Sequence, residues 1–214
     1  MKNTLESITK IGIVPVITIE DTSKAIFLAK ALVAGGIPCA EITFRTAQAA
    51  EAIREITSAV PEIIVGAGTV ISIELAEQAV SAGAQFIVSP GFNPAVVDWC
   101  IEHGISVIPG VNNPTGVELG ISKGLSLLKF FPAEVSGGIA MLDALAGPFP
   151  SISFMPTGGI CPENLCDYIE RKNVFAVGGS WMVKKDLIAR EDWDSITKIS
   201  QEAVLAIQTV RQKK

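Results

Sequence analysis

Residues 125–132 read LSLLKFFP, an apolar run that holds one charged side chain, Lys129. Between Gly124 and the final Pro132, a run of this length is typical of a buried strand. Removing an ammonium group from water is costly unless the group is paired or gives up its proton. A neutral amine is a nucleophile that forms Schiff bases with carbonyl compounds. A lysine that reaches past the strand end, or one in a structural ion pair, is the alternative interpretation.

The rest of the chain alternates short apolar runs of this kind with helical patterns. We predict strands at Gly12–Thr18, Cys39–Phe44, Ile63–Gly68, Gln85–Ser89, Ser106–Gly110, Leu125–Phe131, Ser151–Pro156 and Phe175–Gly179. The predicted helices are Thr4–Lys10, Ser23–Ala34, Ala47–Ala59, Ile73–Ala82, Ala95–His103, Thr115–Lys123, Gly138–Ala146, Pro162–Ile169 and Trp193–Val210. Because parallel strands need a crossover connection, these units predict an α/β fold, a (β/α)₈ TIM barrel with an extra N-terminal helix. At this length the barrel is expected to form a single domain over residues 1–214.

An open, doubly wound sheet is the alternative fold. Such a sheet usually has fewer strands and carries a glycine fingerprint after the first of them. Here the first predicted strand runs into Ile17-Thr18-Ile19-Glu20, which contains no glycine. The barrel is therefore the leading prediction.

Several helix ends have a local explanation. Thr22 or Ser23 is expected to cap the first long helix, and Ser72 the helix that begins at Ile73. Trp181-Met182-Val183, after the last strand, is long enough for one helical turn. Glycines that favour a left-handed backbone just past helix ends are Gly35, Gly36, Gly83, Gly104 and Gly124.

Charge and composition argue against several classes of protein. The chain has 17 Lys and Arg against 22 Asp and Glu, a net charge of −5, and no basic stripe, so no nucleic-acid partner is expected. The terminal Arg211-Gln212-Lys213-Lys214 is interpreted as a solvated helix end. No apolar run approaches the ~18 to 20 residues of a membrane span, so no membrane association is expected. The first residues lack the apolar core of a signal peptide, and we expect a cytoplasmic protein.

The cysteines and the single histidine indicate neither redox nor metal chemistry. Cys161 and Cys166 lack the Cys-x-x-Cys spacing, while Cys39 and Cys100 have apolar neighbours and are expected in the core. His103 comes at the end of a helical pattern, where an imidazole can bind backbone carbonyls. We therefore predict no metal and no cofactor.

Polar side chains lie toward the carboxyl ends of the predicted strands, where barrel enzymes carry their chemistry. Glu41, Thr43 and Arg45 are spaced by two and therefore lie on one face of a strand. A buried carboxylate needs compensation, which Arg45 can supply. A purely structural Glu41–Arg45 pair is the alternative to a functional one.

Two glycine pairs predict an anion site at the same end of the barrel. Thr157-Gly158-Gly159 ends the seventh predicted strand, and Gly178-Gly179-Ser180 ends the eighth. Loops after these strands, with the start of a short helix, form the usual phosphate site of such barrels. The whole set suits a phosphorylated keto acid, with Arg45 on its carboxylate, Lys129 on its ketone and Glu41 moving protons.

Six phrases of the sequence resemble one known family. They are EITFRT (41–46), VGAGTV (65–70), FIVSPG (86–91), KFFPAE (129–134), PTGGI (156–160) and GGSW (178–181). With these phrases the chain resembles the 2-keto-3-deoxy-6-phosphogluconate (KDPG) aldolases, many of which also cleave 4-hydroxy-2-oxoglutarate (KHG). The resemblance implies a metal-free class I aldolase on a (β/α)₈ barrel, usually a homotrimer. The loop Val111–Thr115 departs from members that have threonine before the proline, which concerns substrate preference and not the chemistry.

The resemblance also implies a role for each matching residue. Lys129 would form the Schiff base and Glu41 would act as the acid and base. The implied substrate-binding residues are Arg45 and Thr69 on the pyruvyl carboxylate, Phe131 on the pyruvyl group, Thr157 near the aldehyde, Ser180 with Gly158, Gly159 and Gly179 on the phosphate, and Pro90 of FIVSPG.

The implied reaction cleaves KDPG to pyruvate and glyceraldehyde 3-phosphate, a step of the Entner–Doudoroff pathway, and KHG to pyruvate and glyoxylate. A closely related alternative is a 2-keto-3-deoxy-6-phosphogalactonate aldolase, which prefers the other C4 epimer. More distant alternatives are a phosphosugar epimerase or isomerase and a non-catalytic phosphosugar-binding barrel. An epimerase or isomerase would use paired acids or a metal, which the strand ends do not offer. A binding barrel would not need Lys129 and Glu41 together.

Overall fold

The computed structural model describes residues 2–213 of the chain. The strands are β1 (Ile13–Ile17), β2 (Cys39–Thr43), β3 (Ile64–Gly68), β4 (Phe86–Val88), β5 (Ser106–Ile108), β6 (Gly110–Val111), β7 (Leu127–Phe130), β8 (Ser153–Pro156) and β9 (Val177–Gly179). The α-helices are α1 (Lys2–Ile11), α2 (Ala25–Ala34), α3 (Ala49–Ala59), α4 (Ile73–Ser81), α5 (Pro94–Glu102), α6 (Pro114–Ser122), α7 (Gly138–Ala146), α8 (Pro162–Ile169), α9 (Lys185–Ala189) and α10 (Trp193–Arg211). Short 3₁₀ turns are η1 (Thr22–Lys24), η2 (Glu134–Ser136) and η3 (Trp181–Val183).

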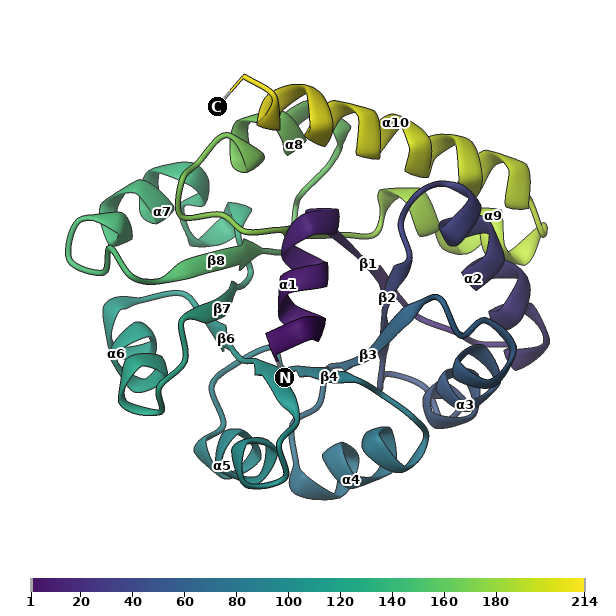
Figure 1. Cartoon of the computed structure of the whole chain (residues 1–214), viewed down its shortest axis with the longest axis horizontal. Coiled ribbons are helices and arrows are strands. Elements are labelled where there is room, and N and C mark those ends of the chain that lie inside the picture. Colours follow the sequence, from purple (N-terminus) through teal and green to yellow (C-terminus); the bar gives the residue numbers. More distant parts are fainter. Residues whose placement is uncertain (1, 214) are drawn as a thin grey trace.

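The fold is α/β, with a parallel sheet that forms a half-barrel. Six strands pair in the order β5-β4-β3-β2-β1-β9, and three more in the order β6-β7-β8. Single parallel bridges, Phe154 to Val174 and Thr157 to Gly178, lie between β8 and the segment that holds β9. Figure 1 shows α2 to α10 around the outside of the strands, whereas α1 lies over the middle of the molecule. The predicted parallel α/β class is confirmed.

The predicted strand Ser106–Gly110 is wrong in one respect, because Pro109 splits it into β5 and β6. Proline has no backbone N–H and cannot donate to a neighbouring strand. The carbonyl of Pro109 still accepts the N–H of Lys129 at 2.9 Å. The chain thus passes from one sheet to the other at Pro109, and Gly110 pairs with Lys129 in register.

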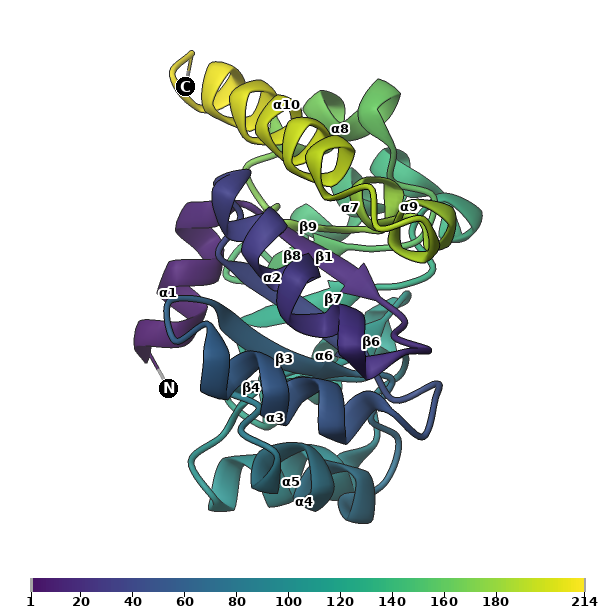
Figure 2. The same cartoon turned by 90° about the vertical axis from the view of Figure 1, so that its right-hand side faces the viewer.

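Two apolar cores follow from the alternation of side chains along the strands. The larger core joins the outer faces of the strands to the helices and includes Ile42, Leu128 and Phe130. The smaller core includes Val14, Phe86 and Met155 from the strands and Ile8 of α1. Figure 2 shows α1 at the side of the molecule away from the strand arrowheads. Helix α1 therefore covers the amino ends of the strands and leaves their carboxyl ends to the site.

The helix ends agree with the sequence in most places. Ser72 caps α4 by accepting the N–H of Leu75, as predicted. The first helix differs, because Asp21 caps η1 in place of Thr22 or Ser23. Gly35 is right-handed, with φ −77°, because the left-handed position falls one residue later. The glycines that adopt the predicted left-handed backbone are Gly36, Gly83, Gly104 and Gly124.

The interpretation of Arg211 as part of a solvated helix end is wrong. Its guanidinium donates to the carbonyls of Lys10 at 2.7 Å, Thr9 at 2.8 Å and Phe175 at 3.0 Å. Partial burial lowers the pKa of this guanidinium. Arg211 therefore joins the last helix to α1, while Lys214 lies outside the described residues.

Candidate active site

Lys129 and Glu41 meet in the interior of the molecule. Lys129 on β7 is 5% exposed and Glu41 on β2 is 1% exposed. The Lys129 Nζ lies 3.2 Å from Glu41 Oε1 and donates a hydrogen bond to it. The alternative of a Glu41–Arg45 pair is therefore wrong, because Glu41 faces β7 across the interior while Arg45 follows the end of β2. Within residues 2–213 Arg45 forms no ion pair.

A glycine makes room for the Glu41 carboxylate. Gly68 lies on β3 beside β2, and a Cβ atom there would collide with Glu41 Oε1. One oxygen of the carboxylate bonds to Lys129, whereas Oε2 is buried without a hydrogen-bond partner in the described structure. A buried acceptor of this kind is costly unless something binds it. The free oxygen is therefore available to a group that reacts at Lys129.

Cys39 lies near this pair on β2 but is not a second nucleophile. Burial raises the pKa of the Cys39 thiol, and the charge of Glu41 raises it further. The thiol therefore stays protonated, and thiolates are the reactive form of cysteine. Cys39 is a core residue, as the sequence predicted.

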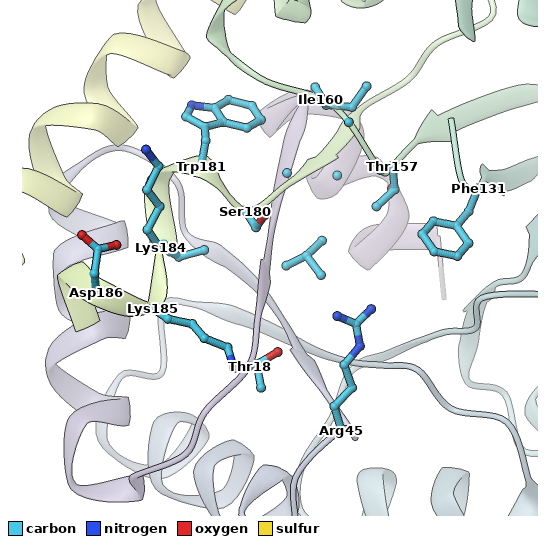
Figure 3. A pocket seen from close by; sticks show the side chains of 16 residues that line it. Thr18, Arg45, Phe131, Thr157, Ile160, Ser180, Trp181, Lys184, Lys185 and Asp186 are labelled. Atoms are coloured by element: carbon cyan, nitrogen blue, oxygen red, sulfur yellow. The ribbon is translucent and has the colours of Figure 1, made fainter. Parts of the chain in front are cut away.

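An open cleft of about 640 Å³ lies beside the Lys129–Glu41 pair. Neither residue of the pair lines the cleft, but Lys129 Nζ is 5.3 Å from the ring centroid of Phe131, which does. Figure 3 shows Arg45 and Phe131 on one side of the cleft and Ser180 and Trp181 on the other. The predicted residues that line it are Arg45, Phe131, Thr157, Gly158, Gly159, Gly179 and Ser180.

The glycine-rich wall of the cleft leaves no space for larger side chains. Gly158 and Gly159 have φ values of +97° and +85°, which favour glycine. A Cβ atom on Gly159 would collide with Glu134 Cγ, and one on Gly179 with the ring of Trp181. Backbone N–H groups in such turns can approach an anion closely. The predicted helical turn after the last strand is present as η3, with Ser180 exposed at its start.

Two predicted residues lie outside this cleft. Thr69 follows β3 with φ +58°, a left-handed conformation that is unusual for a β-branched residue. Pro90 lines a second hollow of about 670 Å³ together with Gly110 and Asn112. Phe131 lines both hollows, whereas Pro90 lines only the second of them.

Several residues that line the cleft were not predicted from the sequence. Thr18 follows β1, and Lys184, Lys185 and Asp186 follow η3. These positions also follow strand ends, so the criterion that selected Arg45 could have found them. Lys185 forms an ion pair with Glu20, at 2.7 Å between Nζ and Oε1.

The described residues, 2–213, contain neither a cluster of metal ligands nor a membrane-spanning helix. Within residues 2–213 no group of three or more His, Cys, Asp or Glu side chains is placed to hold a metal ion. None of the helices in the described part of the chain is long and apolar enough to cross a bilayer.

Comparisons with known proteins agree with this geometry. The model of the KDPG and KHG aldolase family matches residues 5–199. The chain is 48% identical over 199 residues to a 2-dehydro-3-deoxy-phosphogluconate aldolase of Treponema pallidum, with 93% of this chain and 95% of the relative covered. It is 46% identical over 204 residues to the KHG/KDPG aldolase of Escherichia coli K12, with 95% and 96% covered.

A solved structure is similar over nearly the whole chain. It is the KDPG aldolase of Legionella pneumophila, captured at low pH with pyruvate as a covalent carbinolamine. The TM-score is 0.92 at 37% identity, and the match covers 95% of this chain and 99% of that one.

Proposed function

The chain belongs to the KDPG and KHG aldolase family, and we propose that it is a class I aldolase that works through Lys129. It cleaves KDPG to pyruvate and glyceraldehyde 3-phosphate, and KHG to pyruvate and glyoxylate. The observation that carries the proposal is the buried Lys129–Glu41 pair beside a cleft with an anion-binding wall. The carbinolamine of the Legionella enzyme supports a covalent pyruvate adduct in the family.

The reaction starts when Lys129 gives its proton to Glu41 and attacks C2 of the keto acid. Proton exchange within a buried pair replaces two charges by two neutral groups, which a low-dielectric interior favours. The carbinolamine then loses its oxygen as water, with a proton from Glu41, and becomes a protonated imine. Glu41 Oε2, which has no partner in the described structure, faces no competing bond for this task.

Cleavage follows because the protonated imine attracts electrons. The C4 hydroxyl loses its proton to a general base, which we take to be Glu41, and the C3–C4 bond breaks. Its electron pair forms an enamine on C3, while the aldehyde product leaves. Protonation of C3 and hydrolysis of the imine then release pyruvate and restore Lys129.

Most of the proposed substrate contacts line the cleft, and Thr69 and Pro90 are added to them from outside it. Arg45 and Thr69 hold the carboxylate, and Phe131 packs on the pyruvyl group next to Lys129. Thr157 lies near the aldehyde carbon, while Ser180 and the three glycines Gly158, Gly159 and Gly179 bind the phosphate. Pro90 contacts the pyruvyl end from the second hollow.

The test is the release of pyruvate from KDPG, from KHG and from the phosphogalactonate epimer. We expect a higher kcat/KM with KDPG than with KHG, because the carboxylate and the phosphate of KDPG can be held at opposite ends of the cleft. The identity to KDPG aldolases supports KDPG over its C4 epimer, which carries the same two end groups. A higher kcat/KM with the epimer would assign the chain to phosphogalactonate cleavage. Binding of all three without pyruvate release would make it a phosphosugar-binding barrel.

The predicted independence of metals is tested separately. Activity on KDPG should survive dialysis against EDTA, because the imine supplies the electron sink that a metal supplies in other aldolases. Loss of activity that a divalent ion restores would overturn the Schiff-base mechanism.

The complete fold and its assembly belong to the same proposal. We propose that the sheets close into one (β/α)₈ barrel, through the bridges beside β8 and the short link at Pro109. We propose a homotrimer, which the family resemblance and exposed apolar side chains such as Val135 and Ile121 support. We also propose a cytoplasmic location. Light scattering should give three copies per particle, and a monomer would contradict the trimer.

A further inference from the structure

Lys185 occupies a rim of the cleft that the proposed contacts do not use. It is the first residue of α9 and lines the cleft together with Thr18 and Ser180. Figure 3 shows its side chain reaching toward Thr18, whereas the Lys184 side chain turns away from the middle of the cleft. Of the two lysines that line the cleft, Lys185 is therefore the one whose side chain extends along its rim.

The partner of Lys185 in this structure is Glu20, which follows β1. The two side chains are 70% and 67% exposed, with Nζ and Oε1 2.7 Å apart. The Lys185 ammonium lowers the pKa of Glu20 through its hydrogen bond and its charge. An exposed pair of this kind adds little to stability, so Lys185 can change partner at small cost.

Two other charged groups near Lys185, Asp186 and Lys24, have partners of their own. Asp186 also lines the cleft, but Arg190, which follows α9, pairs with it at 3.2 Å. Lys24 donates to the carbonyl of Ala189 at 2.9 Å and lies 3.8 Å from Glu191. Glu20 is therefore the carboxylate that competes most directly for Lys185.

We propose that Lys185 exchanges Glu20 for the phosphate of the substrate, so that this pair sets how strongly the enzyme favours phosphorylated keto acids. A phosphate monoester carries close to two negative charges and outcompetes one carboxylate. Glu20 limits this preference because it holds the lysine when no phosphate is bound. The inference rests on the proposed function and names one of its specificity residues.

Substitutions of Lys185 and of Glu20 should change the KM for KDPG in opposite directions. Lys185→Gln should raise the KM for KDPG about three- to tenfold, because a charged donor is lost at an exposed site. Glu20→Gln should lower this KM about two- to fivefold, because the lysine is freed. The KM for KHG, which has no phosphate, should stay unchanged in both variants, as should kcat.

A double substitution tests whether the two residues act on each other. In the Lys185→Gln background, Glu20→Gln should leave the KM for KDPG unchanged. Lys172→Gln and Glu170→Gln are matched controls, since these exposed residues lie before β9, at the opposite end of its strand from Ser180. They make the same changes of net charge and should not alter either KM.

The outcomes separate this inference from the proposed function. An unchanged KM for KDPG in Lys185→Gln, with KHG cleavage intact, would overturn the role of Lys185 alone. A lower KM from Glu20→Gln that persists without Lys185 would overturn the competition. If the wild-type protein cleaves neither substrate, the proposed function fails. The role of Lys185 is then tested by calorimetric titration with inorganic phosphate. Lys185→Gln must then weaken phosphate binding, and equal affinities would overturn the inference.

Discussion

At the scale of single residues, the site depends on a buried lysine whose one ion-pair partner in the described chain is Glu41. Glu41 uses one oxygen for Lys129 and leaves the other unbonded. A purely structural pair would gain from satisfying both oxygens. The unsatisfied oxygen therefore indicates a proton carrier more than a structural counter-ion.

Glu41→Gln tests this role. The amide keeps the shape of the side chain but cannot exchange protons, so kcat should fall by about 10² to 10⁴. Lys129 also loses its counter-charge, so urea unfolding must be measured on the same protein. A folded variant with near-normal kcat would show that Glu41 is structural and that another group carries the proton.

Thr69 is a second informative residue because its backbone is left-handed. Such a conformation costs roughly 1 to 3 kcal/mol for a β-branched residue, and glycine avoids that strain at an entropic cost of about 0.5 to 1 kcal/mol. Thr69→Gly should therefore unfold with a free energy within about 1 kcal/mol of the wild type or above it. Its kcat/KM should nevertheless fall on both substrates, because the hydroxyl on the carboxylate is lost.

Glu191→Gly is the matched control for Thr69→Gly. Glu191 has φ +57° and follows α9, outside the cleft. Its replacement relieves similar backbone strain without touching the proposed contacts, so kcat/KM should not change. Wild-type kcat/KM in Thr69→Gly would contradict a binding role for Thr69.

At the scale of elements, the loop after β8 is held to the loop after β7. The N–H of Ala133 donates to the carbonyl of Thr157 at 2.8 Å, and that of Glu134 to Gly158 at 3.1 Å. Tyr168 of α8 donates its hydroxyl to Glu134, and Asn164 donates to the carbonyl of Gly159 at 3.0 Å. The loop that follows the strand of Lys129 thus also positions the glycine-rich wall.

Gly159→Ala should disrupt this arrangement. Alanine is strained at the positive φ of this position, and its methyl group collides with Glu134, so the glycine-rich wall must move. The KM for KDPG should rise at least tenfold, by the loss of charge-assisted hydrogen bonds of about 1.5 to 3 kcal/mol. The KM for KHG should change much less.

Gly124→Ala separates backbone strain from the collision. Gly124 has φ +74°, and a Cβ atom there meets nothing within 4 Å. This variant should lose stability, by roughly 1 kcal/mol, but keep both KM values. Equal changes of KM in both variants would mean that Gly159 acts only through stability.

At the scale of the whole molecule, catalysis and stability lie at opposite ends of the strands. Helix α1 packs Ile8 into the smaller core. Arg211 of α10 donates hydrogen bonds to the carbonyls of Lys10, at the end of α1, and of Phe175, just before β9. The cleft lies past the other ends of the strands. Changes at the α1 end are therefore expected to alter stability without altering the chemistry.

Arg211→Met is the test of this separation. It removes a charged donor to three carbonyls, so unfolding should become easier by about 1 to 3 kcal/mol in urea. Activity at a temperature where the protein stays folded should be unchanged, and Lys213→Met should change neither property. A large fall in kcat for folded Arg211→Met would contradict the separation.

The sequence predicted the features that depend on local pattern. The apolar run around Lys129, between Gly124 and Pro132, predicted its strand, and glycine placement predicted most left-handed helix ends. The break at Pro109, the Lys129–Glu41 pairing and the contacts of Arg211 were not predicted. Each depends on residues far apart in the chain, such as Glu41 and Lys129, which periodicity does not relate. The short α9 with Lys185 was missed because its five residues are too few for a periodic signal.

The central claim is that Lys129 forms the covalent bond to the substrate. Treatment with pyruvate and borohydride, followed by peptide mass spectrometry, tests it most directly, because borohydride reduces the imine to a stable amine. We expect one reduced pyruvyl group, located on the peptide that contains Lys129, and loss of activity in proportion to labelling. Lys129→Ala, shown to be folded by circular dichroism, should take up no label. Label on another lysine, or labelling that persists in Lys129→Ala, would show that Lys129 is not the imine-forming residue.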